Sequence, residues 1–538
     1  MSADVDSGHE GRGPAPRWSA LNLCRLVERA GLDADKRAVV CDGESRTYAE
    51  LRDRMVRAGR GLAALGVTPG DRVAVLARNC LEYLELELAI AHAGGIMVPL
   101  NYRLAEAEIA TLLGRSRSRV VVVDAASSSV VAGLRPQLAA LSAAVGLPEA
   151  PSEHVDIEYD DLCAGDAPPI SVEPRMEDPH EITYTSGTTD TPKGVVWTHG
   201  SVMWNSIQQC MDYDISSRDS NYVLNDLYYV GGRHDFTWPL LHQGGTVHIR
   251  RSGNFDARAV MRYLSENAIT KVLLFPVMLF ELLRLPDLLD YDMTSLTTIM
   301  SGGEPVPVAT IDRITTAFPG TDFIQVYGLT EGGASVTFLS GADARRKMGS
   351  CGKAGVHNEV RIASDDGTFV GPDVVGEVCV KGPTVTPGYW NDPERTAEAI
   401  VDGWLHTGDL GRTDEDGFLY IVGRKKDMII SGGMNIYPKE IEDVLGTHPA
   451  IAEVAVIGVP DPKWGERVCA VIRPEPGADI RDEDITALCA GRLASFKKPT
   501  VIHLVEAMPR TASGKVQKQV LRDRLATPAS DTEVSAPC

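Results

Sequence analysis

Short apolar runs alternate with helical patterns through most of the chain. Residues 72–76 predict a strand, residues 80–93 a helix with apolar side chains at helical spacing, and residues 96–100 a second strand after a Gly-Gly pair. The same order recurs near residues 238–249. Strands that alternate with helices form parallel sheets covered by helices. The pattern therefore predicts an α/β fold with two similar halves.

The pattern changes after about residue 350, where short β runs such as 376–380 and 417–422 alternate with Gly, Pro and Asp turns. This is typical of a small antiparallel barrel or sheet. A charged break at residues 423–427 follows. Beyond it we expect a compact α+β unit with a helix over 438–445, strands over 451–458 and 467–473, and a helix over 482–493.

Composition narrows the classes of protein to consider. The 538 residues allow two to four domains, and the apolar fraction of 43% supports large cores. A net charge of −21 disfavours a nucleic-acid partner, because phosphate contacts need clustered Lys and Arg. The ten cysteines contain no C-x-x-C pair, which suits a reducing cytoplasm. Residues 1–17 do not resemble a signal peptide, and we expect no membrane span.

A Ser/Thr-rich segment, YTSGTTDTPKGV, covers residues 184–195 and follows a predicted strand. Backbone N–H groups around its hydroxyls and its glycine, together with Lys193, can converge on an anion, so the segment suits phosphate. It is not a P-loop. Pro192 stands where G-x-x-x-x-G-K-[ST] requires its second glycine, and Gly194 follows the lysine.

Five further segments follow in order: SGGEP (301–305), YGLTE (327–331), WLHTGD (404–409), GR (423–424) and PRTASGK (509–515). With the Ser/Thr-rich segment, they resemble the ordered motifs of the adenylate-forming superfamily. That superfamily includes acyl-CoA synthetases, adenylation domains of peptide synthetases, and luciferases. The resemblance covers about residues 20–525. The superfamily usually has Gly where this chain has Asp190, a residue type that tolerates left-handed backbone.

The resemblance implies a site for ATP and Mg²⁺. Tyr327 would stack on adenine, Asp409 would accept the ribose hydroxyls, and Lys515 would bridge the substrate carboxylate and the α-phosphate. Glu331 would hold Mg²⁺, since a hard cation seeks carboxylate and phosphate oxygens. By the same resemblance, Lys515, Glu331 and Thr330 are catalytic. The implied ATP-binding residues are Thr185, Ser186, Gly187, Thr188, Thr189, Lys193, Gly303, Glu304, Pro305, Tyr327, Gly328, Thr330, Asp409, Arg424 and Lys515.

The domain organisation that the resemblance implies is a large domain over residues 18–425 and a smaller one over 426–525, with disordered tails at 1–17 and 526–538. The large domain would consist of two stacked α/β subdomains and a small β-barrel. The smaller domain would be a mobile α+β unit that turns about a hinge at Lys426. Gly432 and Gly433 would then line the channel for a thiol, because they lack side chains.

The acid pocket of such enzymes lies beside the segment near residue 229 and the strands near 301 and 325. Many acyl-CoA ligases have Pro-Leu-Phe-His there, whereas this chain has Asp226-Leu-Tyr-Tyr229. A phenol does not titrate near neutral pH as a histidine does. If Arg233 or His234 faced the pocket, a polar or aromatic acid would fit better than a fatty chain. The predicted pocket residues are Tyr229, Val230, Gly232, Arg233, His234 and Gly302.

The sequence thus predicts a cytoplasmic ligase that converts a carboxylic acid to its acyl-AMP and transfers the acyl group to coenzyme A. Three alternatives stay open. The acceptor could be a carrier protein, or ATP could activate nitrite to diazotise an aromatic amine, or the chain could be an ATP-binding scaffold without chemistry. A homo-oligomer also stays open.

Overall fold

The computed structural model describes residues 22–29, 31–165, 167–185, 192–304, 306–510 and 516–526. These residues divide into two compact units. The first runs to residue 360 and includes 380–407, and the second comprises 361–379 and the chain from 408 onward. The tails predicted at 1–17 and beyond 526 lie outside the described residues.

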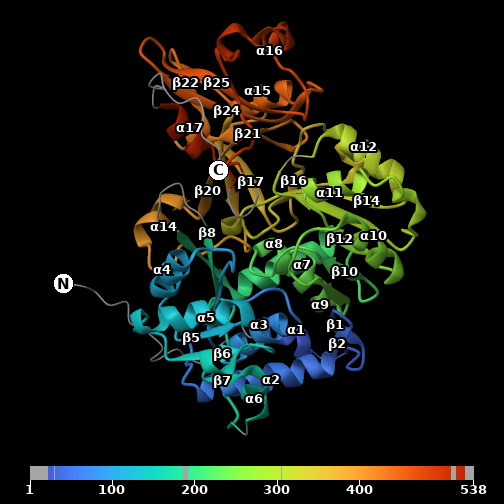
Figure 1. The fold of residues 1–538 in the computed structure, drawn as a ribbon, viewed down its shortest axis with the longest axis vertical. Coiled ribbons are helices and arrows are strands. Elements are labelled where there is room, and N and C mark those ends of the chain that lie inside the picture. Colours follow the sequence, from blue (N-terminus) through green and yellow to red (C-terminus); the bar gives the residue numbers. More distant parts are fainter. Residues whose placement is uncertain are drawn as a thin grey trace, which may run out of the picture. The chain divides into compact units, whose positions relative to one another are not determined.

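A seven-stranded sheet in the first unit has the order β7-β6-β5-β3-β4-β8-β9. Figure 1 labels its strands β5, β6, β7 and β8. All its neighbouring strands are parallel except β8 and β9. β5 is a run of four buried valines, as expected for a parallel strand covered on both faces. Its strands are β3 Arg72–Leu76, β4 Ile96–Pro99, β5 Val120–Val123, β6 Ala143–Gly146, β7 Ile157–Glu158, β8 Pro179–Thr185 and β9 Lys193–Thr198.

The second large sheet has nine strands in the order β16-β15-β14-β13-β12-β10-β11-β1-β2. Its central strands β11, β10, β12, β13 and β14 are parallel. Its strands are β1 Arg37–Cys41, β2 Glu44–Thr47, β10 Ser220–Val223, β11 Thr246–Ile249, β12 Lys271–Leu273, β13 Thr298–Gly302, β14 Asp322–Tyr327, β15 Thr337–Leu339 and β16 Lys353–Ala354.

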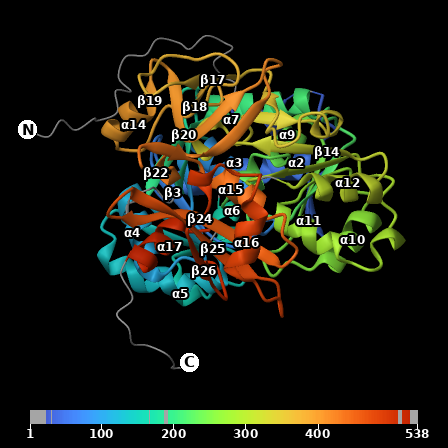
Figure 2. The same ribbon diagram turned by 90° about the horizontal axis from the view of Figure 1, so that it is seen from above.

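Helices join these two sheets through one continuous core. The core contains Val73 of the seven-stranded sheet, Met300 of the nine-stranded sheet, and side chains of α2, α3, α7 and α9. In both ribbon views α10, α11 and α12 lie together beside β14 (Figures 1 and 2). The helices of this unit are α1 Arg25–Glu28, α2 Tyr48–Ala64, α3 Glu82–His92, α4 Glu106–Ser116, α5 Ala125–Leu134, α6 Tyr159–Ala164, α7 His199–Asp212, α8 Val230–Arg233, α9 Thr237–Gln243, α10 Ala257–Glu266, α11 Pro276–Leu283, α12 Val308–Ala317 and α13 Gly341–Ala344.

A five-stranded sheet has the order β17-β18-β20-β19, with β21 beside β20. It corresponds to the small antiparallel barrel or sheet predicted from the turn-rich segment. Its elements are β17 Glu359–Ala363, β18 Gly376–Lys381, α14 Pro393–Ala399, β19 Ile400–Val401, β20 Trp404–Thr413 and β21 Leu419–Arg424.

The last part of the second unit is an α+β fold with the sheet order β23-β22-β25-β24 and β26 beside β25. Helices α15 and α16 lie side by side against this sheet (Figure 2). Its elements are β22 Ile429–Ser431, β23 Met434–Ile436, α15 Pro438–Leu445, β24 Ile451–Asp461, β25 Gly465–Pro474, α16 Asp482–Cys489, β26 Val501–Leu504 and α17 Lys518–Ala526.

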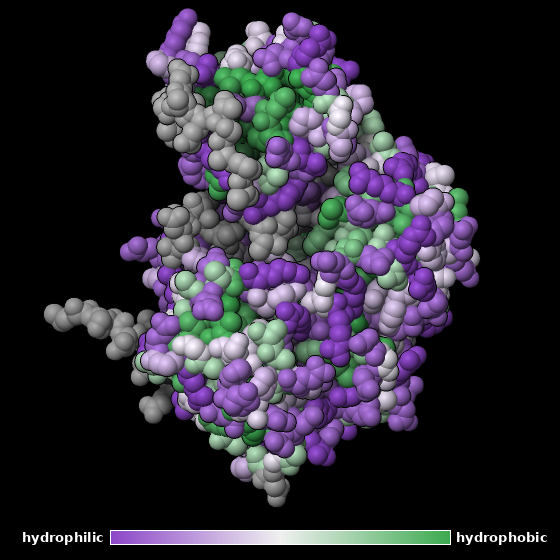
Figure 3. Space-filling model, viewed as in Figure 1, coloured by the Kyte–Doolittle hydropathy of each residue, from purple (hydrophilic) through white to green (hydrophobic). Residues whose placement is uncertain are grey.

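The predicted fold class, a mixed α/β protein with a small C-terminal α+β domain, is confirmed. The mobility of that domain and its predicted first residue, Lys426, stay predictions. Polar side chains cover most of the face drawn in Figure 3, in keeping with the charged composition. Within the described part of the chain, no helix is long and apolar enough to cross a membrane.

Candidate functional site

The predicted phosphate loop connects β8 and β9. These strands form an antiparallel hairpin in which Thr185 stands opposite Lys193 and Tyr184 opposite Gly194. Ser186, Gly187, Thr188 and Thr189 lie outside the described residues. The hairpin therefore fixes the base of the loop, with Thr185 on one side and Lys193 on the other.

The second part of the site lies where β13 and β14 end. Gly302 pairs with Val326, and a Cβ on Gly302 would lie 2.6 Å from the Val326 Cγ2 atom. Gly303 adopts a φ of +83° and is exposed, as is Glu304, and Pro305 lies outside the described residues. These features let the chain turn sharply at the carboxyl end of β13, where ligands of open α/β sheets bind.

Tyr327 ends β14 and is half-buried. The following Gly328 packs so closely that a Cβ there would lie 1.4 Å from the Ala334 carbonyl oxygen. Only glycine fits at this position. In the Tyr-Gly pair of the motif, Tyr327 therefore supplies an aromatic ring, and Gly328 is required by the packing of the backbone.

Glu331 lies in a short 3₁₀ helix, η5 Thr330–Gly332. The Tyr389 hydroxyl donates a hydrogen bond of 3.0 Å to Glu331 Oε1, and the Lys193 Nζ atom lies 5.0 Å from the centroid of the Tyr389 ring. Burial and the Glu331 carboxylate both raise the pKa of Tyr389, so the phenol stays protonated and remains a donor. Tyr389 thus contacts both Lys193, the predicted phosphate-binding cation, and Glu331, the predicted metal ligand.

The segment from Thr384 to Trp390 holds this tyrosine in place. Thr386 N–H donates to the Glu331 carbonyl (2.8 Å), and Trp390 N–H donates to the Gly194 carbonyl (2.7 Å). The Thr386 hydroxyl donates to the Val196 carbonyl at 2.6 Å. We call residues 384–390 the bridging segment, because its backbone joins β9 to η5. Sequence reasoning missed Tyr389, since its partners come from β9 and from η5.

The residues around Glu331 suit Mg²⁺. A carboxylate supplies the hard oxygen that this ion prefers, and Mg²⁺ in nucleotide sites is commonly held by one or two carboxylates together with substrate phosphates. The phenol on Oε1 orients the carboxylate, in the way that groups behind a metal ligand commonly do. The ligand set is therefore chemically consistent with the predicted role.

Asp409 and Arg424 belong to the second unit, on neighbouring strands β20 and β21. The two residues stand opposite each other in the strand register, and Arg424 Nε lies 3.1 Å from Asp409 Oδ1. The Asp409 side chain is only 7% exposed, whereas Arg424 is half exposed. The structure thus brings together the two predicted ribose ligands.

Lys426 is exposed in a 3₁₀ helix, η6 Lys425–Asp427, directly after β21. The next residue, Asp427, accepts a hydrogen bond of 2.7 Å from Arg522 of α17. Gly432 and Gly433 form the two-residue loop between β22 and β23, with φ of +58° and +79°. Two left-handed residues are what a tight hairpin of this type requires. Lys515 lies outside the described residues.

Arg233 and His234 correct an expectation, because neither lines a pocket. Both are fully buried, and Arg233 donates two hydrogen bonds, of 2.6 and 2.7 Å, to the Glu181 carboxylate. His234 Nε2 lies 2.9 Å from the same carboxylate, and its ring stacks on Trp197 with centroids 4.3 Å apart. Burial alone would raise the pKa of Glu181, but Arg233 and His234 outweigh it and hold that pKa well below its ordinary value.

The same buried cluster extends to α3. Glu87 Oε1 accepts a hydrogen bond from Trp238 Nε1 at 3.0 Å and lies 3.0 Å from His180 Nε2, and Arg233 Nη1 lies 3.4 Å from Glu87 Oε2. Glu87, Glu181 and His234 offer ligand atoms close enough together for a metal ion. The Arg233 guanidinium already lies against both carboxylates, so we assign the cluster a structural role in joining α3, β8 and α8.

The other predicted pocket residues differ in exposure. Tyr229 is half-buried, with its ring 4.4 Å from that of Tyr228. Val230 and Gly232 are buried, and a Cβ on Gly232 would lie 2.4 Å from the Asp226 carbonyl oxygen. Gly232 is therefore required by packing. Tyr229 remains a candidate for contact with an acid.

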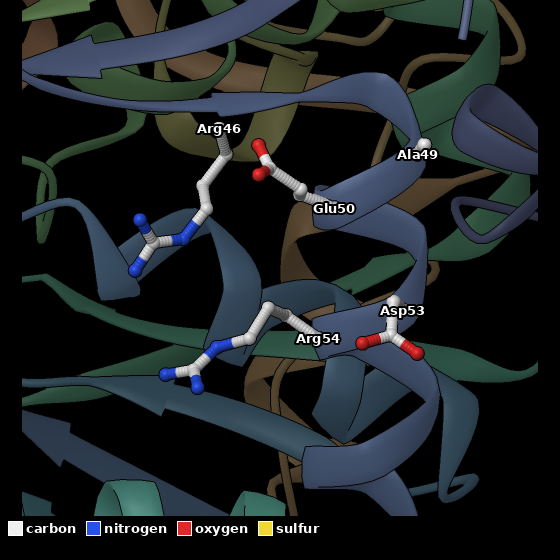
Figure 4. A pocket seen from close by; sticks show the side chains of 5 residues that line it. All are labelled: Arg46, Ala49, Glu50, Asp53 and Arg54. Atoms are coloured by element: carbon white, nitrogen blue, oxygen red, sulfur yellow. The ribbon is translucent and has the colours of Figure 1, made fainter. Parts of the chain in front are cut away.

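A hollow of about 420 Å³ lies beside α2, and none of the predicted residues lines it (Figure 4). Its wall contains Arg46 and Arg54, whose Nε atoms donate to the buried Glu85 at 2.8 and 2.9 Å. Glu50 and Asp53 line the same hollow. The arginines are thus paired inside the fold and the remaining wall charges are acidic, so we assign no anion site here.

In its fold and candidate site, the molecule has the features of a nucleotide-binding ligase. Comparison with known proteins agrees with this class. The model of the AMP-binding enzyme family matches residues 26–390, and that of the AMP-binding enzyme C-terminal domain matches residues 440–515. The chain therefore belongs to the AMP-binding enzyme family of the adenylate-forming superfamily.

Several relatives that match over nearly the whole length are CoA ligases, and one is a fatty acid–[acyl-carrier-protein] ligase from Streptomyces coeruleorubidus, 34% identical over 90% of this chain and 93% of its own. A feruloyl-CoA synthase from an Amycolatopsis species is 38% identical over 93% of this chain and 98% of its own. An indoleacetate–CoA ligase from Aromatoleum aromaticum is 36% identical over 94% and 98%. Among solved structures, ATP-bound MatB from Rhodopseudomonas palustris has a TM-score of 0.86 at 30% identity, covering 94% of this chain and 99% of that one. The protein is an adenylate-forming ligase of the acyl-CoA synthetase type.

Proposed function

We propose that the protein joins an aromatic carboxylic acid to coenzyme A in two steps. In the first, a carboxylate oxygen attacks the α-phosphorus of ATP, and pyrophosphate leaves. In the second, the CoA thiol gives up its proton, its sulfur attacks the acyl carbon, and AMP leaves. The relatives named for feruloyl-CoA and indoleacetate support an aromatic acid. The half-buried Tyr229 at the predicted pocket is compatible with an aromatic ring.

The observation that carries this proposal is the arrangement of Lys193, Tyr389 and Glu331. Two anions must come together in the first step, and their repulsion opposes it. Lys193 would offset the charge of the phosphates, and Mg²⁺ at Glu331 would supply further positive charge there. Tyr389 would hold both side chains in register, since it contacts each of them. Positioning and charge stabilisation then account for most of the catalysis.

The remaining roles follow the family motifs. Tyr327 would stack on adenine, Thr330 would reach the phosphates, and the Asp409–Arg424 pair would bind the ribose. Lys515 would bridge the carboxylate and the α-phosphate. Gly432 and Gly433 would border the thiol channel after the smaller domain turns about Lys426. We expect Thr185 and Lys193, together with Ser186, Gly187, Thr188 and Thr189 of the loop between them, to hold the terminal phosphates.

A pyrophosphate-release screen over aromatic and aliphatic acids, with and without CoA, tests the proposal. We expect release with aromatic acids, and an acyl-CoA product only when CoA is present. If a thioester forms on a carrier protein and CoA stays inert, the acceptor is the carrier protein and not CoA. AMP release that needs nitrite and an arylamine would support diazotisation instead. Failure of every acid to release pyrophosphate would contradict acid activation.

A further inference from the structure

Asp235 follows Arg233 and His234 in the chain but does not join their cluster. Its Oδ1 atom accepts hydrogen bonds of 3.0 Å from Gln209 Nε2 and 3.0 Å from Ser335 Oγ. Gln209 is itself fully buried in α7, where its Oε1 accepts from Phe236 N–H at 3.1 Å. These contacts hold the carboxyl group in one orientation.

The second oxygen, Oδ2, has no donor among the described residues. It lies 3.5 Å from the position that a Cβ on Gly231 would occupy, and Leu273 Cδ2 and Phe275 Cζ lie 3.6 and 3.9 Å from the same position. The missing side chain of Gly231 thus leaves a small space between a carboxyl oxygen, an aliphatic side chain and an aromatic ring.

Phe275 connects this space to the predicted site. A Cβ on the exposed Gly303 would lie 3.8 Å from the Phe275 ring, so this ring extends from Gly231 to the turn at the end of β13. Gly231 and Gly303 therefore both lie close to the edge of the Phe275 ring, at Cζ and Cε1 respectively. An aromatic acid whose carboxylate lies near that turn could place its ring against Phe275 and its far substituent near Oδ2.

The pKa of Asp235 decides at which pH its Oδ2 atom is an acceptor. Burial raises the pKa of Asp235 to about 7, and the hydrogen bonds from Ser335 and Gln209 offset this only in part. No cation pairs with the group among the residues that the structure describes. Above about pH 7 the group is mainly a carboxylate, and its Oδ2 atom can then accept a hydrogen bond from a ligand but cannot donate one.

We propose that Asp235 determines substrate specificity by accepting, at Oδ2, a hydrogen bond from an amino or hydroxyl group on the ring of the acid. This inference rests on the proposed function and narrows it to aromatic acids with a ring N–H or O–H donor. A site built to bond a polar group rejects analogues that lack it, because its own polar atom is then left unpaired.

The test compares benzoic and cinnamic acids that differ in one ring substituent: hydrogen, amino, hydroxyl or methoxy. The methoxy group accepts a hydrogen bond but cannot donate one. Pyrophosphate release, measured at about pH 8.5 so that Asp235 is ionised, gives kcat/KM for each acid. We expect the wild type to favour the amino or hydroxyl member over the methoxy member by about 10²-fold or more, the order seen when a polar site loses its partner. Comparison of the amino-substituted acids with the hydroxyl-substituted acids of the same skeleton shows which of the two ring substituents the enzyme prefers.

The decisive variant is Asp235→Asn. Its amide oxygen can keep the bonds from Gln209 and Ser335, which points its N–H₂ group into the space at Gly231. The preference should then invert toward the methoxy acid. Asp219→Asn is the matched control, since Asp219 is bonded to Ser216 and Thr270 near the opposite, amino-terminal end of β10. It should keep the wild-type preference.

A second variant, Gly231→Ala, fills the space and leaves the carboxyl group unchanged. The alanine methyl would make ordinary contacts of 3.5 Å or more, so the fold should tolerate it. It should raise KM for the donor-bearing acids more than for the unsubstituted acid. Equal treatment of all substituents by the wild type, or an unchanged preference in Asp235→Asn, would overturn the inference while acid activation stands. Absence of pyrophosphate release with any acid would overturn the proposed function as well.

Discussion

Tyr389 shows how a single side chain can organise charges supplied by distant parts of the chain. Its hydroxyl bonds Glu331, and its ring lies under the Lys193 ammonium group. No spacing rule connects the three positions, which come from the bridging segment, η5 and β9. Lys193 and Glu331 could be predicted because each lies in a motif, whereas Tyr389 could be found only when the fold brought it between them.

The variant Tyr389→Phe tests this role. It keeps the ring under Lys193 but removes the hydrogen bond to Glu331. We expect kcat/KM for ATP to fall about 10-fold, the effect of losing roughly 1.4 kcal/mol of hydrogen bonding to a charged group. The requirement for Mg²⁺ should shift to higher concentrations, as measured by pyrophosphate release against Mg²⁺. An unchanged Mg²⁺ dependence would show that the phenol does not orient Glu331.

Arg233 illustrates the opposite case, a charged residue that is structural. The sequence offered no signal for this, because its partners Glu87 and Glu181 lie in α3 and β8. A guanidinium surrounded by two buried carboxylates compensates their charge. Its removal would leave both without that partner.

Arg233→Met should therefore lower the free energy of unfolding at pH 7 by about 3–5 kcal/mol, the usual cost of breaking a buried ion pair. Because Arg233 keeps the pKa of Glu181 low in the folded wild type, its stabilisation is present above the unfolded pKa of about 4.3 and fades as pH falls below it. The double variant Arg233→Met with Glu181→Gln should recover part of the loss. Urea unfolding at several pH values measures both effects, and a loss independent of pH would argue against an electrostatic cause.

At the scale of helices and strands, short apolar runs predict the buried strands well. Strand β3 spans Arg72–Leu76 as expected, because four of its five side chains are buried in a parallel sheet. The helix predicted over 482–493 ends at Cys489 instead, since Ala490 is extended with a ψ of 127° and Gly491 then adopts a φ of +73°. Helical spacing alone does not reveal such an end. Pairing between sheets, and hence the cluster around Glu181, depends on contacts that no local pattern contains.

The hairpin β22–β23 provides a prediction at this scale. Both loop glycines adopt a positive φ, but a Cβ on Gly432 would lie 2.8 Å from Trp464, whereas one on Gly433 would meet nothing within 4 Å. Gly433→Ala should cost about 1–2 kcal/mol from left-handed strain alone. Gly432→Ala should cost more, because the Trp464 ring must also move. Urea unfolding of the two variants, followed by Trp fluorescence, checks the order, and equal losses would exclude the contact with Trp464.

At the scale of the whole molecule, the residues predicted to carry the chemistry are divided between two units. Lys193, Tyr389 and Glu331 belong to the first, and Asp409, Arg424 and the Gly432–Gly433 loop belong to the second. The predicted hinge residue Lys426 lies in η6, at the start of the C-terminal α+β fold. A domain that acts in both steps must present different residues in each of them.

Lys426→Pro tests the hinge. Proline fixes φ near −65°, which agrees with a 3₁₀ conformation but prevents a large rotation. We expect acyl-AMP formation to stay within a few-fold of the wild type, while thioester formation falls by about 10²-fold or more, as judged by pyrophosphate release and acyl-CoA yield. Lys426→Ala removes the charge without fixing φ and should retain both steps. Equal loss of both steps in the proline variant would contradict a hinge.

Gly328 and Gly232 carry a consequence for how such sequences change with time. Each is required because backbone oxygen atoms lie where a Cβ would be, 1.4 Å from Ala334 O and 2.4 Å from Asp226 O. The fold requires these glycines whether or not the protein uses ATP. A descendant that became a pseudoenzyme would keep them and would be free to lose Lys193, Tyr389 and Glu331. A homologue that keeps both glycines but has lost the charged residues would therefore have kept the fold and lost the catalytic activity.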